Sequence, residues 1–173
     1  ENSDKIKLGR DNFSIEYWVR KKITTVGDGY NNVWGVNKWI SGGSQGQNEW
    51  SLGLGDANVD QFQFIIESGS TIYSTAAYPL SMNQWYQVVG IRKDNKLQLY
   101  VNGILRQENT PSFFTNNLAV NNSGKKIRIN NSYLNTYYTG ADSAILRIYK
   151  KALTKEEVRN NFNEFRGRFG LWQ

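Results

Sequence analysis

The chain alternates between hydrophobic and polar residues over most of its length, which is the period-two pattern of half-buried β-strands. The clearest alternation lies in residues 12–22. There, one side of the predicted strand carries Phe13, Ile15, Tyr17 and Val19, and the other carries Ser14, Glu16, Trp18 and Arg20. A strand of this kind buries one face in a core, so we expect the first set to point inward.

The same pattern predicts several further strands. They cover residues 36–41, 50–54, 61–66, 85–93, 96–101, 104–107, 126–130 and 143–150. Asn102-Gly103 separates two alternating runs, and this dipeptide is a strong hairpin signal because both central residues of a type I′ turn need positive φ. Eight or more short antiparallel strands with turns between them predict an all-β sandwich or jelly roll.

One amphipathic helix is predicted near the end of this β pattern. Thr154 and Glu157 form a T-x-x-E capping box, and Leu153 before the cap can pack on Val158. The apolar positions then recur at helical spacing: Val158, Phe162 and Phe165. Gly167 is the expected stop. We expect this helix to cover the β core.

The composition removes most enzyme mechanisms. The 173 residues include no histidine and no cysteine, so the commonest general base, thiolate nucleophiles and zinc-thiolate sites are missing. The 21 basic and 15 acidic residues give a net charge of +6, which mildly favours anionic partners. The basic residues form no stripe, so we expect no nucleic-acid binding. No stretch resembles a membrane span or a leader, and we expect a soluble module of a larger protein.

Three segments resemble the laminin G-like, concanavalin A-like lectin and glucanase domains. NFSIEYWVR resembles their opening core strand, and NQWYQVVGIRKDNKLQLYVNGIL resembles their central hairpin. TGADSAILRIYKKALTKEEVRNNFN resembles their closing strand and helix. The resemblance implies one concanavalin A-like, two-sheet antiparallel jelly-roll sandwich over residues 1–173, with the short C-terminal α-helix packed on it.

The glucanase members of this fold carry an E-x-D-x-x-E strand, whose paired carboxylates serve as nucleophile and acid/base. That spacing is absent here: the acidic residues Glu16, Glu49, Glu67 and Glu108 are isolated along the chain. We therefore expect no catalysis and predict a binding module. A carboxylate pair assembled from distant strands, making a glycosidase or lyase, stays open as a weaker alternative.

Sugar sites combine aromatic platforms with amide and guanidinium groups that hydrogen-bond hydroxyls. Trp50 and Trp85 are expected in the core. Trp34 lies in a polar stretch and is the best single platform candidate, and Trp18 points to the face of its strand opposite the core set. A second candidate region follows the strand at 126–130, and its side chains are Asn130, Asn131, Tyr133, Tyr137 and Tyr138.

Two arginines add a preference for acidic glycans. Arg128 and Arg147 are expected to point outward from neighbouring strands, where they can meet a sulfate or carboxylate. The family also implies an optional calcium ion held by loop acids. Candidate oxygen ligands are Asp28, Asp56, Asp60 and Asp142, although no D-x-D-x-D cluster is present.

These observations predict a non-catalytic carbohydrate-binding or adhesion module. Its partners would be a polysaccharide or cell-surface glycan and the other domains of a parent protein, at an extracellular, cell or virion surface. The main alternative is a structural or assembly domain of a viral particle or tail that binds no sugar. The fold hosts many activities, so this choice depends on the site.

Overall fold

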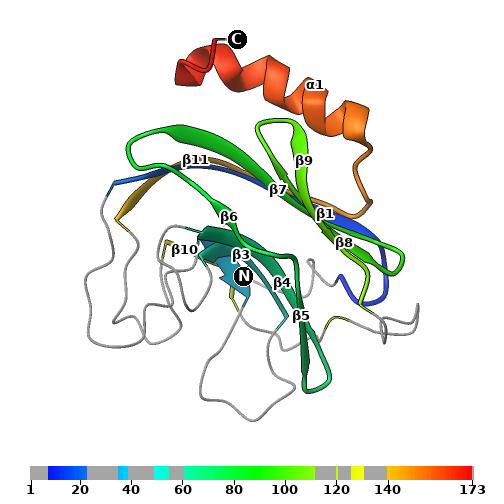
Figure 1. The fold of residues 1–173 in the computed structure, drawn as a ribbon. Coiled ribbons are helices and arrows are strands. Elements are labelled where there is room, and N and C mark those ends of the chain that lie inside the picture. Colours follow the sequence, from blue (N-terminus) through cyan, green and yellow to red (C-terminus); the bar gives the residue numbers. More distant parts are fainter. Residues whose placement is uncertain are drawn as a thin grey trace.

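The computed structural model describes residues 8–22, 35–38, 49–54, 61–111, 120, 126–130 and 140–172, and the account below concerns these residues. They form a β-sandwich with one helix on its outside (Figure 1). Its strands are β1 (Phe13–Lys21), β2 (Val36–Lys38), β3 (Trp50–Leu54), β4 (Gln61–Ser68), β5 (Thr71–Ser74), β6 (Tyr78–Pro79), β7 (Trp85–Lys93), β8 (Lys96–Val101), β9 (Ile104–Asn109), β10 (Arg128–Ile129) and β11 (Ala141–Tyr149).

The strands make two antiparallel sheets that face each other. In the first sheet, the order within the described residues is β11-β1-β7-β8-β9. In the second, the order is β10-β2-β3-β4-β5, with β6 paired to β4. The predicted concanavalin A-like sandwich is therefore confirmed, and so is the central antiparallel meander of β7, β8 and β9.

The alternation of β1 divides the first sheet into two buried faces. Phe13, Ile15, Tyr17 and Val19 lie in the core between the sheets. Phe13 contacts Phe64 of the opposite sheet edge to face, with ring centres 6.0 Å apart. The inward set was predicted correctly, because burying one face of a strand fixes its register.

The hairpin between β8 and β9 is built as the sequence predicts. Asn102 and Gly103 have φ angles of 52° and 74°. Both angles lie in the left-handed region that a two-residue type I′ turn requires. A side chain at Gly103 would also crowd Phe162, because an added Cβ would lie 3.3 Å from the ring's Cδ1. The turn thus lies directly under the helix.

The helix α1 (Lys155–Phe165) lies across the outer face of the first sheet (Figure 1). Its capping box is complete: the Glu157 N–H donates to the Thr154 hydroxyl oxygen at 3.2 Å, and the Thr154 N–H donates to the Glu157 carboxylate at 2.8 Å. A second buried cluster fills the space between helix and sheet: Val89, Ile91, Tyr100, Leu153 and Val158. The predicted start and the predicted covering role are both confirmed.

The α-helix ends at Phe165 with Arg166 as its C-cap, so the stop predicted at Gly167 is correct in position, but Gly167 is not a left-handed cap. After Phe165 the chain continues as the 3₁₀-helix η2 (Arg166–Phe169), and Gly170 is the left-handed cap, with φ of 71°. Gly167 serves another purpose, because Trp172 occupies the space that its side chain would need. Among the described residues, no helix is long and apolar enough to span a lipid bilayer.

Candidate functional site

A groove of about 470 Å³ opens where the C-terminal segment meets one end of the first sheet. This volume lies in the range typical of small-ligand sites, which is about 300–1,000 Å³. Seven lining residues come from the sheet side: Arg20, Asn83, Gln84, Trp85, Asn102, Ile104 and Arg106. Five come from the C-terminal segment: Phe162, Phe169, Gly170, Leu171 and Trp172. We call this site the tail groove.

A row of stacked rings runs from beneath the helix to the floor of the tail groove. Trp18 stacks on Phe169, with ring centres 4.5 Å apart, and Phe169 contacts Trp85 at 4.7 Å. The Arg20 guanidinium carbon lies 5.1 Å from the centre of the Trp85 ring, in the geometry of a cation–π contact. Strand pairing explains the row, because Arg20 and Trp85 are partners in the register of β1 and β7.

Trp172 forms an exposed wall of the groove. Its side chain is 79% exposed, the largest exposure of a big hydrophobic residue among those described. One edge of the indole rests on the backbone at Gly167: a Cβ added there would lie only 2.9 Å from its Cη2. Glycine at 167 therefore seats the ring, and much of the indole stays open to a ligand.

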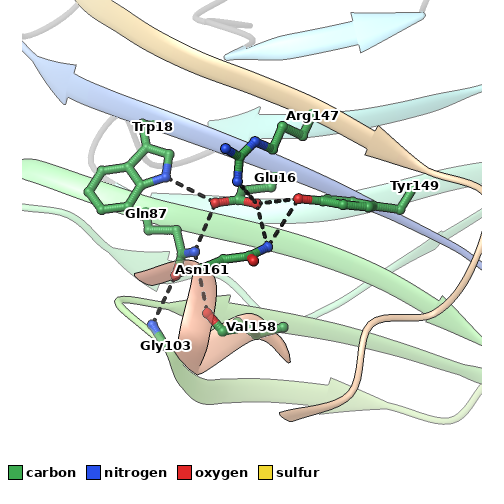
Figure 2. Close-up of polar contacts among 8 residues, drawn as sticks. All are labelled: Glu16, Trp18, Gln87, Gly103, Arg147, Tyr149, Val158 and Asn161. Atoms are coloured by element: carbon green, nitrogen blue, oxygen red, sulfur yellow. Dashed lines mark hydrogen bonds and ion pairs between the residues drawn. The ribbon is translucent and has the colours of Figure 1, made fainter. Parts of the chain in front are cut away.

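A buried carboxylate holds the helix and the groove wall to the sheet. Glu16 is fully buried beneath α1. Its Oε1 accepts hydrogen bonds from Trp18 Nε1 and Gln87 Nε2, each at 3.0 Å. Its Oε2 accepts from the Tyr149 hydroxyl and from Asn161 Nδ2 of the helix, each at 2.9 Å. Figure 2 shows these donors converging on the carboxylate from the sheet and from α1.

Neighbouring groups stabilise the hydrogen bonds of this network. Burial, and after it the negative charge of Glu16, raises the pKa of Tyr149, so the hydroxyl remains protonated and can donate. Arg147 Nη1 lies 3.8 Å from Glu16 Oε2 and supplies a compensating positive charge. A buried carboxylate needs such partners, because burying an unpaired charge is costly.

Gln87 extends the network to the groove. Its side-chain Oε1 accepts from the Gly103 N–H at 3.1 Å, and its backbone N–H donates to Asn102 Oδ1 at 3.0 Å. Through Gly103, the β8–β9 turn is therefore held by the same network that holds α1 (Figure 2). The Gln87 backbone holds Asn102 in the same turn.

Two of the predicted site residues are buried by the helix or engaged with it. Trp18 is 0% exposed and stacks on Phe162, so the prediction that it offers an open sugar platform is wrong. Its ring lies on the predicted face, but α1 covers that face. Arg147 is partly exposed, yet its guanidinium pairs with Glu16 and lies 4.6 Å from the ring centre of Phe165.

The region around residue 130 also differs from the expectation. Arg128 lies on β10 and Arg147 on β11, and these strands belong to different sheets, so the two arginines do not come from neighbouring strands. The Asn130 amide is used internally: its Nδ2 donates to the Ala141 carbonyl at 2.9 Å, and its Oδ1 accepts from the Tyr17 hydroxyl at 2.6 Å. Asn130 thus ties the sheets together.

The other five predicted site residues lie outside the described residues: Trp34, Asn131, Tyr133, Tyr137 and Tyr138. Three of the four predicted calcium ligands, Asp28, Asp56 and Asp60, lie there too. The fourth, Asp142, accepts a hydrogen bond from Arg20 Nε at 2.8 Å and also faces Lys22. Within the described ranges, no group of three or more acidic side chains gathers to hold a metal ion.

The sequence missed the two tryptophans of the groove. Trp50 is fully buried, as predicted, but Trp85, predicted as core, is only partly buried and lines the groove. Trp172 was not singled out. The sequence of β7 contains one weak signal that Trp85 points away from the core, because Trp85 lies on the same side of the strand as the polar Gln87. Both faces of β7 carry apolar residues, Val88 on one and Val89 on the other, so alternation alone does not assign the ring to either.

A second hollow, of about 350 Å³, lies near the other ends of β1 and β7. Its side chains largely satisfy one another. Asn12 Nδ2 donates to the Asp94 carboxylate at 3.1 Å, and Asn12 Oδ1 accepts from the Asp94 N–H at 2.7 Å. Arg92 Nη1 donates to the Gly9 carbonyl at 2.9 Å. With no described aromatic side chain among its lining residues, this hollow has no platform for a sugar.

Comparisons with known proteins show the family to which this fold belongs. Residues 2–159 match the family described as the concanavalin A-like lectin/glucanases superfamily, under the name Laminin_G_3. No curated protein matches the chain.

Solved structures with the same fold include binding domains of botulinum neurotoxin. One is a binding domain of neurotoxin DC in complex with SialylT: it is 16% identical with a TM-score of 0.61, and the match covers 90% of this chain. A second is the same domain in complex with rat synaptotagmin II, also 16% identical, with a TM-score of 0.62 and 90% coverage.

A third structure is from botulinum neurotoxin type C, and its description says that cell entry of this toxin depends on interaction with two ganglioside molecules. It is 15% identical with a TM-score of 0.65, and the match covers 95% of this chain. The chain spans only 36%, 36% and 38% of the length of these three structures, respectively.

Proposed function

The chain belongs to the concanavalin A-like lectin/glucanases superfamily, and from this membership we propose that it is a non-catalytic carbohydrate-binding or adhesion module. It would hold a glycan at a cell or virion surface as one part of a larger extracellular protein. The tail groove is the proposed binding site.

The composition of the groove carries this proposal. Trp172 offers a seated, largely exposed indole, and Trp85 lies on the floor beside it. Sugars have flat apolar faces edged with hydroxyl groups, so a site for them needs both an aromatic surface and polar side chains. The groove supplies those polar groups as the amides of Asn83, Gln84 and Asn102.

The described carboxylates support binding over hydrolysis. Glu16 is enclosed by donors, Glu49 pairs with Lys38 at 2.9 Å, and Glu108 pairs with Lys96 at 2.7 Å. A glycosidase needs two carboxyl groups facing one bond across a cleft. Among the residues that the structure describes, no acidic side chain lines the tail groove.

The neurotoxin domains add support of a general kind. Their descriptions name SialylT and gangliosides as partners of those proteins. A glycan is therefore a natural first ligand class to test on this chain. Trp34 stays a proposed glycan contact, and so, separately, do Asn131, Tyr133, Tyr137 and Tyr138.

We expect Trp172→Ala to weaken glycan binding about tenfold, since a stacking platform contributes roughly 1–3 kcal/mol. Glycan-array screening followed by calorimetry with the best ligand measures this. A second variant, Gly167→Ala, keeps the indole but pushes it from its seat, so it should also weaken binding.

The matched control is Ile72→Ala, which removes a 56% exposed apolar side chain from the other sheet and should leave affinity unchanged. If no glycan binds the unaltered chain, the module is better explained as a structural or assembly domain. Reducing-sugar release from a polysaccharide panel would contradict the non-catalytic part of the proposal.

A further inference from the structure

The polar groups of the tail groove are mainly hydrogen-bond donors. The orientation of Asn102 is fixed, because its Oδ1 already accepts from the Gln87 N–H at 3.0 Å. A backbone N–H can only donate, so the amide oxygen must face it and the NH₂ group points elsewhere. Asn102 therefore has donors left for a ligand.

Gln84 is oriented by a short chain of hydrogen bonds. The Ser81 N–H donates to the Tyr86 hydroxyl oxygen at 3.0 Å, and the Tyr86 hydroxyl in turn donates to Gln84 Oε1, also at 3.0 Å. The oxygen of Gln84 is thereby occupied. Its NH₂ group remains as a donor at the groove.

The charge of the groove has the matching sign. Two arginines line it and no acidic residue does, among the residues that the structure describes. Arg20 is largely compensated, since Asp142 accepts from its Nε at 2.8 Å. Arg106 is exposed and lies over the Tyr78 ring, with 5.3 Å from the guanidinium carbon to the ring centre. Within the described part of the chain, no carboxylate pairs with Arg106.

From this donor-rich, positively charged lining we propose that the tail groove selects acidic sugars, with Arg106 as the residue that recognises the anionic group. The ligand would carry a carboxylate or a sulfate on the sugar ring, because both present several acceptor oxygens to guanidinium and amide donors. This inference rests on the proposed function. It adds the charge class of the glycan and the residues that set it.

The experiment uses a glycan array in which each acidic oligosaccharide is paired with its neutral form, carboxyl-reduced or desulfated. We expect the acidic member of a pair to bind at least tenfold more tightly, and its affinity to fall as salt is raised. The carboxylated and sulfated arms show which anionic group is preferred.

Two variants test the assignment. Arg106→Gln should lower affinity for the acidic sugar about tenfold while the neutral form binds as before. Gln84→Glu replaces an exposed amide by a nearly isosteric carboxylate and should weaken the acidic ligand more than its neutral form, because repulsion adds to the loss of one donor. Lys93→Gln is the control. It removes one positive charge at the other end of β7, roughly 25 Å along the strand from Trp85.

The outcomes separate the two proposals. If acidic and neutral members bind equally well, or if Arg106→Gln and Lys93→Gln act alike, the inference is overturned while sugar binding stands. If no member of the array binds, the proposed function fails, and the inference fails with it. A preference for acidic members that is lost in Arg106→Gln supports both.

Discussion

At the scale of single residues, Tyr17 shows how the sheets are fastened together. Its ring is fully buried in the sandwich core, and its hydroxyl donates to Asn130 Oδ1 at 2.6 Å and contacts the Ser143 hydroxyl. Burial raises its pKa to about 12, although these two hydrogen bonds act in the opposite direction. The folded state therefore holds the neutral phenol more strongly than the unfolded chain does.

This pKa difference predicts an alkaline loss of stability. Below about pH 10, tyrosine is protonated in both states, so the stabilising effect is fully present. As the pH rises toward 12 the unfolded state loses its proton first, and about 2–3 kcal/mol of unfolding free energy is lost. Urea denaturation across this range measures the slope.

Tyr17→Phe is the comparison protein. It is less stable at neutral pH because Asn130 and Ser143 lose a partner, but its stability should fall less steeply between about pH 10 and pH 12. Tyr100 and Tyr149, whose pKa values burial also raises, remain in both proteins. Parallel curves for the two proteins would show that Tyr17 does not contribute to the pH dependence.

For single residues, the sequence predicted the face of the strand to which a side chain points better than it predicted what packs over that side chain. Alternation placed Trp18 on the correct side of β1, but it contained no information that Phe162 and Phe169 would lie over the ring. Trp85 was predicted as core from its place in the family motif, and alternation could not correct this because both faces of β7 carry apolar residues. Seating of Trp172 depends on a contact with Gly167, which no local pattern encodes.

At the scale of secondary-structure elements, α1 is held by a polar anchor as well as by apolar packing. Asn161 Nδ2 donates to Glu16 at 2.9 Å, and Gln87 Nε2 donates to the same carboxylate from β7 at 3.0 Å. Val158 of the helix packs on the sheet beside them. The anchor fixes the helix in one position, and with it the segment that forms the groove wall.

Glu16→Gln should loosen this element. The amide keeps the size of the carboxylate but turns one acceptor into a donor, which then faces other donors in a buried space. We expect a loss of about 3 kcal/mol in unfolding free energy, measured by urea denaturation. Amide hydrogen exchange should show α1 losing protection more than the strands do.

The control for this variant is Glu108→Gln on β9. Glu108 pairs with Lys96 at the surface, where an ion pair contributes less than about 1 kcal/mol. Equal losses for the two variants would mean that the buried network contributes no more than an exposed pair.

The start of the helix was predictable because its signal is local. Thr154 and Glu157 bond each other across three residues, so the capping box can be read from the sequence alone. The end was predictable in position but not in its capping residue. A glycine at 167 resembles a stop, yet the first residue with a left-handed backbone is Gly170.

At the scale of the whole molecule, the sandwich and the tail groove are built from different parts of the sequence. The family match covers residues 2–159, which include all the described strands. Five of the groove-lining residues lie beyond it, from Phe162 to Trp172. The fold was therefore predictable from strand alternation, turns and family motifs. The groove was not, because it forms only when the last residues pack against β7.

The most direct test of the tail groove uses the six tryptophan indole signals in a nitrogen–proton correlation spectrum, assigned by single Trp→Phe variants. During titration with the best glycan from the array, we predict that the signals of Trp172 and Trp85 shift together and that of Trp50 stays in place. Shifts at Trp34, with Trp172 and Trp85 unmoved, would contradict the assignment of the binding site to the tail groove.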